Sequence, residues 1–168
     1  MGKNMTIEHE NRPCLKLTRF CGEEFYPINK ATWQYYKDKE GNMNEIWLEI
    51  EANFGTVLHE DTEYLKSKPH WELTIRAENL NIDDLVTDFR AEIPCGYIED
   101  LDDSLANFYY CEHEPSDNNV IEILATEERR FLIRVTGETT DVNYYDGSKP
   151  KNKIFVETWF DEFKKPNA

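Results

Sequence analysis

Four consecutive residues near the middle of the chain, Cys111-Glu112-His113-Glu114, offer a thiol, an imidazole and two carboxylates. Such groups ligate zinc and exchange protons in active sites. A structural zinc site gathers three or four ligands, usually from separated pairs such as C-x-x-C, and this chain has no C-x-x-C pair. A strand over 107–113 would also place Cys111 and His113 on one face and the two glutamates on the other, because successive side chains alternate.

The four side chains therefore do not converge on one ion, although Cys111 and His113 could supply two ligands. A strongly negative neighbourhood raises the pKa of a thiol and suppresses its nucleophilic thiolate form. We interpret Cys111 as a structural cysteine and expect it, with His113, to face the core or a second layer.

The chain also lacks the nucleotide-binding and nucleophile-elbow glycine motifs. We predict no metal, no cofactor and no enzymatic activity; an enzyme using His59 or His113 with nearby carboxylates is a third alternative.

The net charge narrows the class of partner. Thirty-four acidic residues against nineteen lysines and arginines give a net charge of −15. Such a field repels nucleic acid and anionic membranes and attracts cations. The first residues contain no apolar signal segment, and no run approaches the roughly 20 apolar residues of a membrane-spanning helix. We expect a cytoplasmic protein that binds neither nucleic acid nor membrane; the sequence does not predict its oligomeric state.

The acidic residues are concentrated in one part of the chain. Residues 91–128 contain eleven aspartates and glutamates and no lysine or arginine, so they carry −11 of the total −15. Like charges this dense repel one another and destabilise the fold. A cationic partner would relieve that repulsion, whereas a solvated surface without a partner is the alternative interpretation.

Alternation of apolar and polar residues with period two predicts that most of the chain is β-strand. The predicted strands cover 14–20, 32–37, 44–54, 70–77, 107–113, 120–126, 130–137 and 153–160. Turn residues at 38–42, 115–119 and 125–129 predict hairpins, so neighbouring strands should pair antiparallel. We predict one mainly β (α+β) domain over 1–168, an antiparallel β-sandwich or strongly curved sheet, with 1–12 and 164–168 loose.

The segment 82–108 departs from this pattern. Its apolar residues recur at helical spacing: Ile82, Leu85, Val86 and Phe89, and then Ile98, Leu101, Leu105 and Phe108. Asn81 is a suitable N-cap for the first stretch. We predict one or two short helices here, whose acidic residues would face outward, and a strand over 85–93 stays open as an alternative.

These observations favour a non-enzymatic module that captures a basic protein partner, because concentrated opposite charge speeds such an encounter. Small acidic proteins that inhibit a basic toxin or nuclease, as bacterial immunity proteins do, have this general profile, although no motif identifies the chain as one. The predicted partner-binding residues are Asp83, Asp84, Asp88, Glu99, Asp100, Asp102, Asp103, Glu112 and Glu114, with Trp47, Tyr144, Tyr145 and Trp159 as aromatic anchors.

The aromatic residues also support a second hypothesis. Trp47, Phe155 and Trp159 fall on strand faces that carry glutamates, and such mixtures suit a protein interface or a sugar platform. A β-sandwich module that binds a small ligand, a sugar or a cation, through Trp47, Trp159 and Tyr144 is therefore the alternative function. The same rings could equally form a second core layer if both faces of the sheet are covered.

Overall fold

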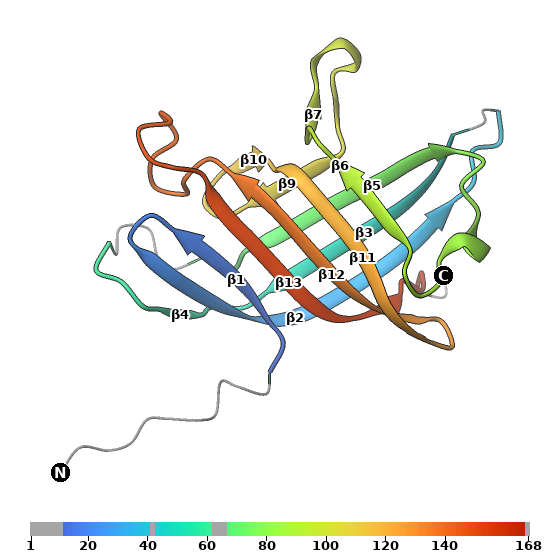
Figure 1. The fold of residues 1–168 in the computed structure, drawn as a ribbon, viewed down its shortest axis with the longest axis horizontal. Helices are drawn as coiled ribbons and strands as arrows, with labels where there is room; N and C mark the ends of the chain where they lie inside the picture. The colour runs from blue at the N-terminus through green and yellow to red at the C-terminus, as the bar shows by residue number, and fades with distance from the viewer. Residues whose placement is uncertain (1–11, 41–42, 62–66, 167–168) are drawn as a thin grey trace.

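The computed structural model describes residues 12–40, 43–61 and 67–166, and these residues are almost entirely β-structure (Figure 1). The strands are β1 Cys14–Arg19, β2 Gly22–Tyr36, β3 Met43–Ala52, β4 Thr56–Val57, β5 His70–Glu78, β6 Arg90–Ile93, β7 Tyr97–Ile98, β8 Asp103–Ser104, β9 Ala106–Tyr109, β10 His113–Pro115, β11 Asp117–Glu127, β12 Arg130–Thr139 and β13 Asn152–Glu162. Two single-turn 3₁₀ helices, η1 Ile82–Asp84 and η2 Glu99–Leu101, interrupt them. Of the predicted loose ends, 1–11 and 167–168 lie outside the described residues.

Eleven of these strands form one sheet, in the order β10-β9-β5-β3-β2-β1-β13-β12-β11-β6, with β4 beside β2. Its ladders are antiparallel except for a short parallel contact between the end of β13 and β2. The predicted β-rich, mainly antiparallel fold is therefore confirmed. None of the helices in the described part of the chain is long and apolar enough to cross a membrane.

Strand β2 connects two arms of this sheet. It pairs with β1 and β4 near its start and with β3 further along, where the register shifts between Ile28 and Lys30. Such a bulge bends a strand, and the sheet curves so that the inner faces of the two arms pack on each other (Figure 1). The indole nitrogen of Trp71 in β5 donates to Ser116 Oγ at 2.9 Å, and Ser116 Oγ donates to Asn119 Oδ1 in β11 at 2.8 Å, which ties the arms together across the core.

The predicted inner faces of four strands are buried. They comprise Ile46, Leu48 and Ile50; Trp71, Leu73 and Ile75; Phe131, Ile133 and Val135; and Ile154, Val156 and Phe160. Alternation places these apolar side chains on one face, and removing them from water is the main force that closes the arms. On the opposite face Trp47 is 44% and Phe155 38% exposed, so these two rings do not form a second core layer.

Between residues 82 and 108 the helices are shorter than the apolar spacing suggests. Asn81 caps η1 as expected, but the helix ends after one turn and Asp88 takes a left-handed conformation (φ 73°) before β6. In the second stretch η2 is only the tip of a hairpin between β7 and β8, and Asp102 (φ 46°) turns the chain back. Leu101 is consequently 66% exposed instead of lying on an inward stripe.

The strand predicted over 107–113 is also divided. Residues 110–112 reverse the chain, and β10 pairs antiparallel with β9, so the predicted turn at 115–119 is not the hairpin turn. Tyr110 is buried at the start of this reversal. Cys111 and His113 are exposed, and the prediction that they face the core or a second layer is wrong.

Candidate functional site

A hairpin of residues 96–105 projects from the body of the protein (Figure 1). Its strands β7 and β8 pair with each other through Tyr97–Ser104 and Ile98–Asp103, and they form a two-stranded sheet separate from the large one. Glu99, Asp100 and Asp102 are exposed around the exposed side chain of Leu101. We call this element the acidic hairpin.

The base of the acidic hairpin is fixed to the sheet through Gly96. Its carbonyl accepts the amides of Leu105 at 2.7 Å and Ala106 at 3.1 Å, and its own amide donates to Asp117 Oδ1 at 3.0 Å. A Cβ atom at this position would lie 2.3 Å from the Ser116 carbonyl oxygen and 2.5 Å from that of Ala106. Only glycine permits so close a backbone contact, so the hairpin leaves the sheet in one defined direction.

The acids of the hairpin differ in their partners. Asp103 forms an ion pair with Arg76 of β5 at 2.6 Å, and Asp102 accepts the hydroxyl of Tyr97 at 2.5 Å. These hydrogen bonds raise the pKa of Arg76 and of Tyr97. Within residues 12–40, 43–61 and 67–166, Glu99 and Asp100 form no ion pair, so their charges face solvent uncompensated.

The remaining predicted acids lie elsewhere. Asp83 and Asp84 belong to η1, which Figure 1 places well away from the acidic hairpin, and Asp88 follows in the loop before β6. Glu112 is at the tip of the β9–β10 hairpin and Glu114 in β10, where burial and Glu112 raise the pKa of the Glu114 carboxyl. The predicted acids fall within 83–114 of the sequence but occupy three places in the structure.

The four predicted aromatic anchors lie in three places: Trp47 on β3, Trp159 on β13, and Tyr144 with Tyr145 in the loop before β13. Tyr144 packs edge-on against Phe20 with ring centroids 5.7 Å apart, and burial raises the pKa of Tyr145 to about 12, with further effects from Cys111 and Glu112. Trp159 is half-buried on β13 under the guanidinium of Arg130, 5.3 Å from the ring centroid. Trp47, on β3, is connected to the acidic hairpin by hydrogen bonds through Glu45 and Arg76.

That connection runs along the outer face of the β2–β3–β5 ladder. The face presents Lys30, Thr32, Gln34 and Tyr36 from β2, Glu45, Trp47, Glu49 and Glu51 from β3, and His70, Glu72, Thr74 and Arg76 from β5. The indole nitrogen of Trp47 donates to Glu45 Oε2 at 2.7 Å, and Glu45 Oε1 accepts from Arg76 Nε at 2.7 Å. Arg76 then reaches Asp103, so Trp47 and the hairpin belong to one continuous surface.

The opposite end of this face holds a group that the sequence analysis did not identify. Donor atoms of Glu49, Glu51 and His70 lie within 4.8 Å of one another, a spacing at which they could hold a metal ion. Imidazole and carboxylate suit several divalent transition metals. Lys30 already supplies a positive charge there, with its ammonium nitrogen 3.5 Å from Glu49 and 3.4 Å from Glu51. The Cys111–Glu114 quartet is not part of this group.

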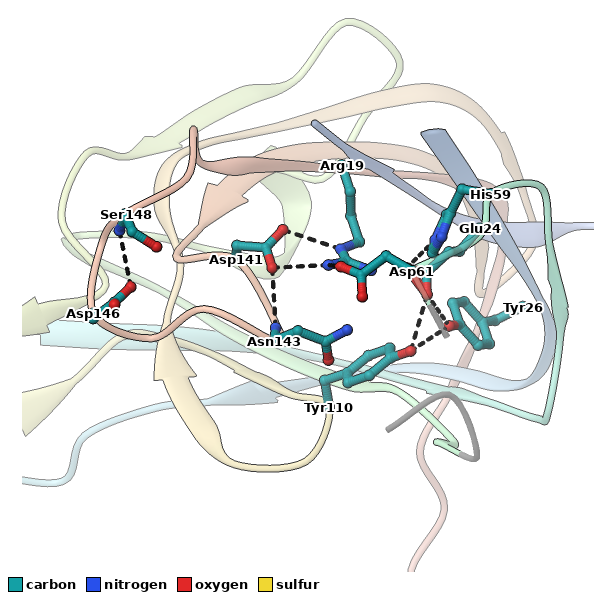
Figure 2. A network of polar contacts seen from close by, with 10 residues as sticks. All are labelled: Arg19, Glu24, Tyr26, His59, Asp61, Tyr110, Asp141, Asn143, Asp146 and Ser148. Carbon is teal, nitrogen blue, oxygen red and sulfur yellow. Dashed lines mark hydrogen bonds and ion pairs between the residues drawn. The ribbon is translucent and has the colours of Figure 1, made fainter. Parts of the chain in front are cut away.

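A second missed feature is the buried polar network in Figure 2, which joins Arg19 of β1 and Glu24 of β2 to Tyr110 after β9 and Asp141 after β12. Arg19 donates Nε to Asp141 Oδ2 and Nη2 to Asp141 Oδ1, both at 3.0 Å, and Nη2 also contacts Asp61 at 2.8 Å. Burial alone would lower the pKa of Arg19, but these carboxylates raise it above its usual range.

The same network contains a glutamate between two tyrosines. Glu24 Oε1 accepts the hydroxyls of Tyr26 and Tyr110, each at 2.9 Å, and both phenols have a raised pKa because they are buried beside that carboxylate. His59, one candidate of the enzyme alternative, lies 3.7 Å from Glu24 with only 1% of its side chain exposed. The side chains of Arg19, Glu24, His59 and Asp141 are at most 1% exposed, whereas Asp61 at the edge of the network is 18% exposed.

The thiol of Cys111 behaves as its surroundings predict. Burial and the neighbouring Glu112 carboxylate raise its pKa, which disfavours the thiolate.

Comparison with protein-family models, curated proteins and solved structures finds no match to this chain. The acidic hairpin and the outer face that joins it are therefore the candidate site on their geometry alone.

Proposed function

We propose that the protein captures a basic protein partner through the acidic hairpin, in the manner of an inhibitor or immunity protein that blocks a toxin or nuclease. This proposal is supported above all by Glu99 and Asp100, which form no ion pair among the described residues and lie on a projecting hairpin beside Leu101, which is 66% exposed. Unpaired carboxylates steer a cationic surface. The exposed apolar side chain of Leu101 would be removed from water by contact with a partner, and this removal favours binding.

The anchoring at Gly96 supports this role. A hairpin that already has one orientation loses little conformational entropy when it binds. The ion pair between Asp103 and Arg76 holds its base against the sheet, and Glu99 and Asp100 remain available at its tip. A projecting tip also fits a recessed site in a basic enzyme better than a flat acidic face would.

The test compares two doubly neutralised proteins. Wild type, Glu99→Gln/Asp100→Asn and Glu127→Gln/Glu128→Gln are immobilised and exposed to an extract of the cells that produce the chain. The second pair is the matched control, because Glu127 and Glu128 are exposed acids at the β11–β12 turn. We expect a basic protein that wild type and the control retain and the hairpin variant loses.

Stopped-flow kinetics with that purified protein then test the mechanism. We expect the association rate to fall steeply between low and physiological salt, and the Glu99→Gln/Asp100→Asn variant to associate more slowly with a weaker salt dependence. Association that is insensitive to salt, or an equal loss in both double variants, would contradict capture by the hairpin.

A further inference from the structure

A groove of about 420 Å³ runs along the outer face of β2, β3 and β5. Its aromatic wall is formed by Tyr36 and Trp47, whose ring centroids are 4.0 Å apart with 39° between the planes, and Phe163 lines it as well. This volume lies within the range of roughly 300–1,000 Å³ that is typical of small-ligand pockets. The groove is open to solvent, since Trp47 is 44% exposed.

The charged residues that line this groove are both acidic. They are Glu49 and Glu72, direct neighbours across the β3–β5 ladder. Like charges directly opposite each other are destabilising in a sheet. Lys30 and His70 lie near Glu49, whereas Glu72 lies 3.6 Å from His70 Nε2 and its side chain is 58% exposed. Glu72 therefore keeps most of its capacity to accept hydrogen bonds from an added cation.

Aromatic faces beside carboxylates select one class of ligand. A guanidinium or ammonium group is attracted to the face of a tryptophan or tyrosine and forms charge-assisted hydrogen bonds with carboxylates. An anion would be repelled by the two glutamates. The ring of Trp47 is held by its hydrogen bond to Glu45, so its orientation is set before a ligand arrives.

The groove continues into the acidic hairpin. Glu45 links Trp47 to Arg76, and Arg76 contacts Asp103 at the base of the hairpin. A partner seated on the hairpin therefore extends naturally over the groove. We infer that the groove receives a cationic side chain, an arginine or lysine, of the same basic partner, between the Tyr36–Trp47 pair and Glu72; this inference rests on the proposed function.

Binding of a single arginine tests the groove without the partner. The probe is acetyl-Gly-Arg-Gly-amide, and its neutral counterpart carries citrulline in place of arginine. The indole N–H resonance of Trp47, assigned with Trp47→Phe, is followed by NMR during titration. We expect a saturable shift with the arginine peptide and an affinity about 2- to 5-fold lower for the citrulline peptide.

Variants locate the interaction. Trp47→Ala should abolish saturable binding, observed on backbone amides of β3 and β5, while Trp47→Phe retains part of it. Glu72→Gln should weaken binding about 2- to 5-fold, and Glu127→Gln, an exposed acid on another strand, should leave it unchanged. Trp47 is 44% exposed and lies on the outer face of the sheet, away from the core, so its replacement is compatible with folding.

Three outcomes would overturn the inference: equal affinity for the citrulline peptide, unchanged binding in Trp47→Ala, or saturable binding of a neutral oligosaccharide that is stronger than that of the arginine peptide. The last outcome would assign a sugar to the groove. Failure here is distinguishable from failure of the hairpin, because Glu99→Gln/Asp100→Asn should leave peptide binding intact. If the peptide binds but that variant captures the partner normally, the proposed function is wrong and the groove remains a cation site.

Discussion

Carboxylates lie in two contrasting surroundings in this protein. In the buried polar network, Asp141 makes two hydrogen bonds to Arg19 and Glu24 accepts two tyrosine hydroxyls. On the acidic hairpin, Glu99 and Asp100 face solvent without an ion pair among the described residues. Burying a charge is tolerable only when it is paired, whereas water solvates an exposed charge at little cost. The buried carboxylates are therefore committed to the fold, and the exposed ones remain available to another molecule.

The largest effect expected from this contrast is on stability. Asp141→Asn leaves the fully buried Arg19 guanidinium with Asp61 as its remaining ion-pair partner. Removing one partner of a buried pair costs about 3–5 kcal/mol, so we expect the free energy of unfolding in urea to fall by that amount. Asp100→Asn is the matched change at an exposed site and should alter it by less than about 0.5 kcal/mol. Similar losses in the two variants would remove the distinction between the regions.

A smaller effect is expected at the junction of the hairpin with the sheet. In Gly96→Ala the new methyl group would meet two carbonyl oxygens that belong to the backbone and cannot rotate away. We expect a loss of about 1–3 kcal/mol and faster hydrogen exchange at the amides of Leu105 and Ala106, which bond to Gly96. Ser104→Ala, at an exposed hairpin position, should leave both unchanged. Normal exchange in Gly96→Ala would mean that the hairpin is not held at this point.

The strands and their inner faces could be predicted because alternation is a local signal. The helices over 82–108 were overestimated because the apolar spacing also fits a chain that turns back on itself. The spacing alone does not reveal the left-handed residues Asp88 and Asp102 that break it. For the same reason the acidic residues predicted to form one binding surface over 83–114 lie in three separate places, at η1, on the acidic hairpin and at the β9–β10 hairpin.

No local sequence pattern predicted the buried polar network. Arg19 and Asp141 are 122 positions apart, and neither lies in a motif. The residues of the outer face could be predicted in part, because alternation places Glu49 and Glu51 on one face of β3 and His70 and Glu72 on one face of β5. The sequence did not reveal the register that pairs Glu49 with Glu72 and Glu51 with His70, because that register depends on which strands become neighbours.

Alkaline pH tests the contribution of the buried polar network to stability. Burial beside Glu24 raises the pKa of Tyr26 and Tyr110 above the usual 10.0, so the folded protein retains protons that the unfolded chain releases. The free energy of unfolding should therefore fall as the pH rises above 10, by about 1.4 kcal/mol per pH unit for each phenol. Tyr110→Phe should reduce this slope by about 1.4 kcal/mol per pH unit, although it also loses about 1–2 kcal/mol at neutral pH with its hydroxyl. Parallel slopes for the two proteins would contradict coupling through these tyrosines.

The smallest effect concerns the exposed acids themselves. Glu99→Gln/Asp100→Asn should leave the free energy of unfolding unchanged at high salt and raise it by less than about 0.5 kcal/mol at low salt, because neighbouring like charges then repel without screening. Urea unfolding at two ionic strengths measures the difference, with Glu127→Gln/Glu128→Gln as the control pair. A clear loss of stability at either ionic strength would show that these carboxylates have structural partners. They would then be no more available to a basic protein than the carboxylates of the buried polar network.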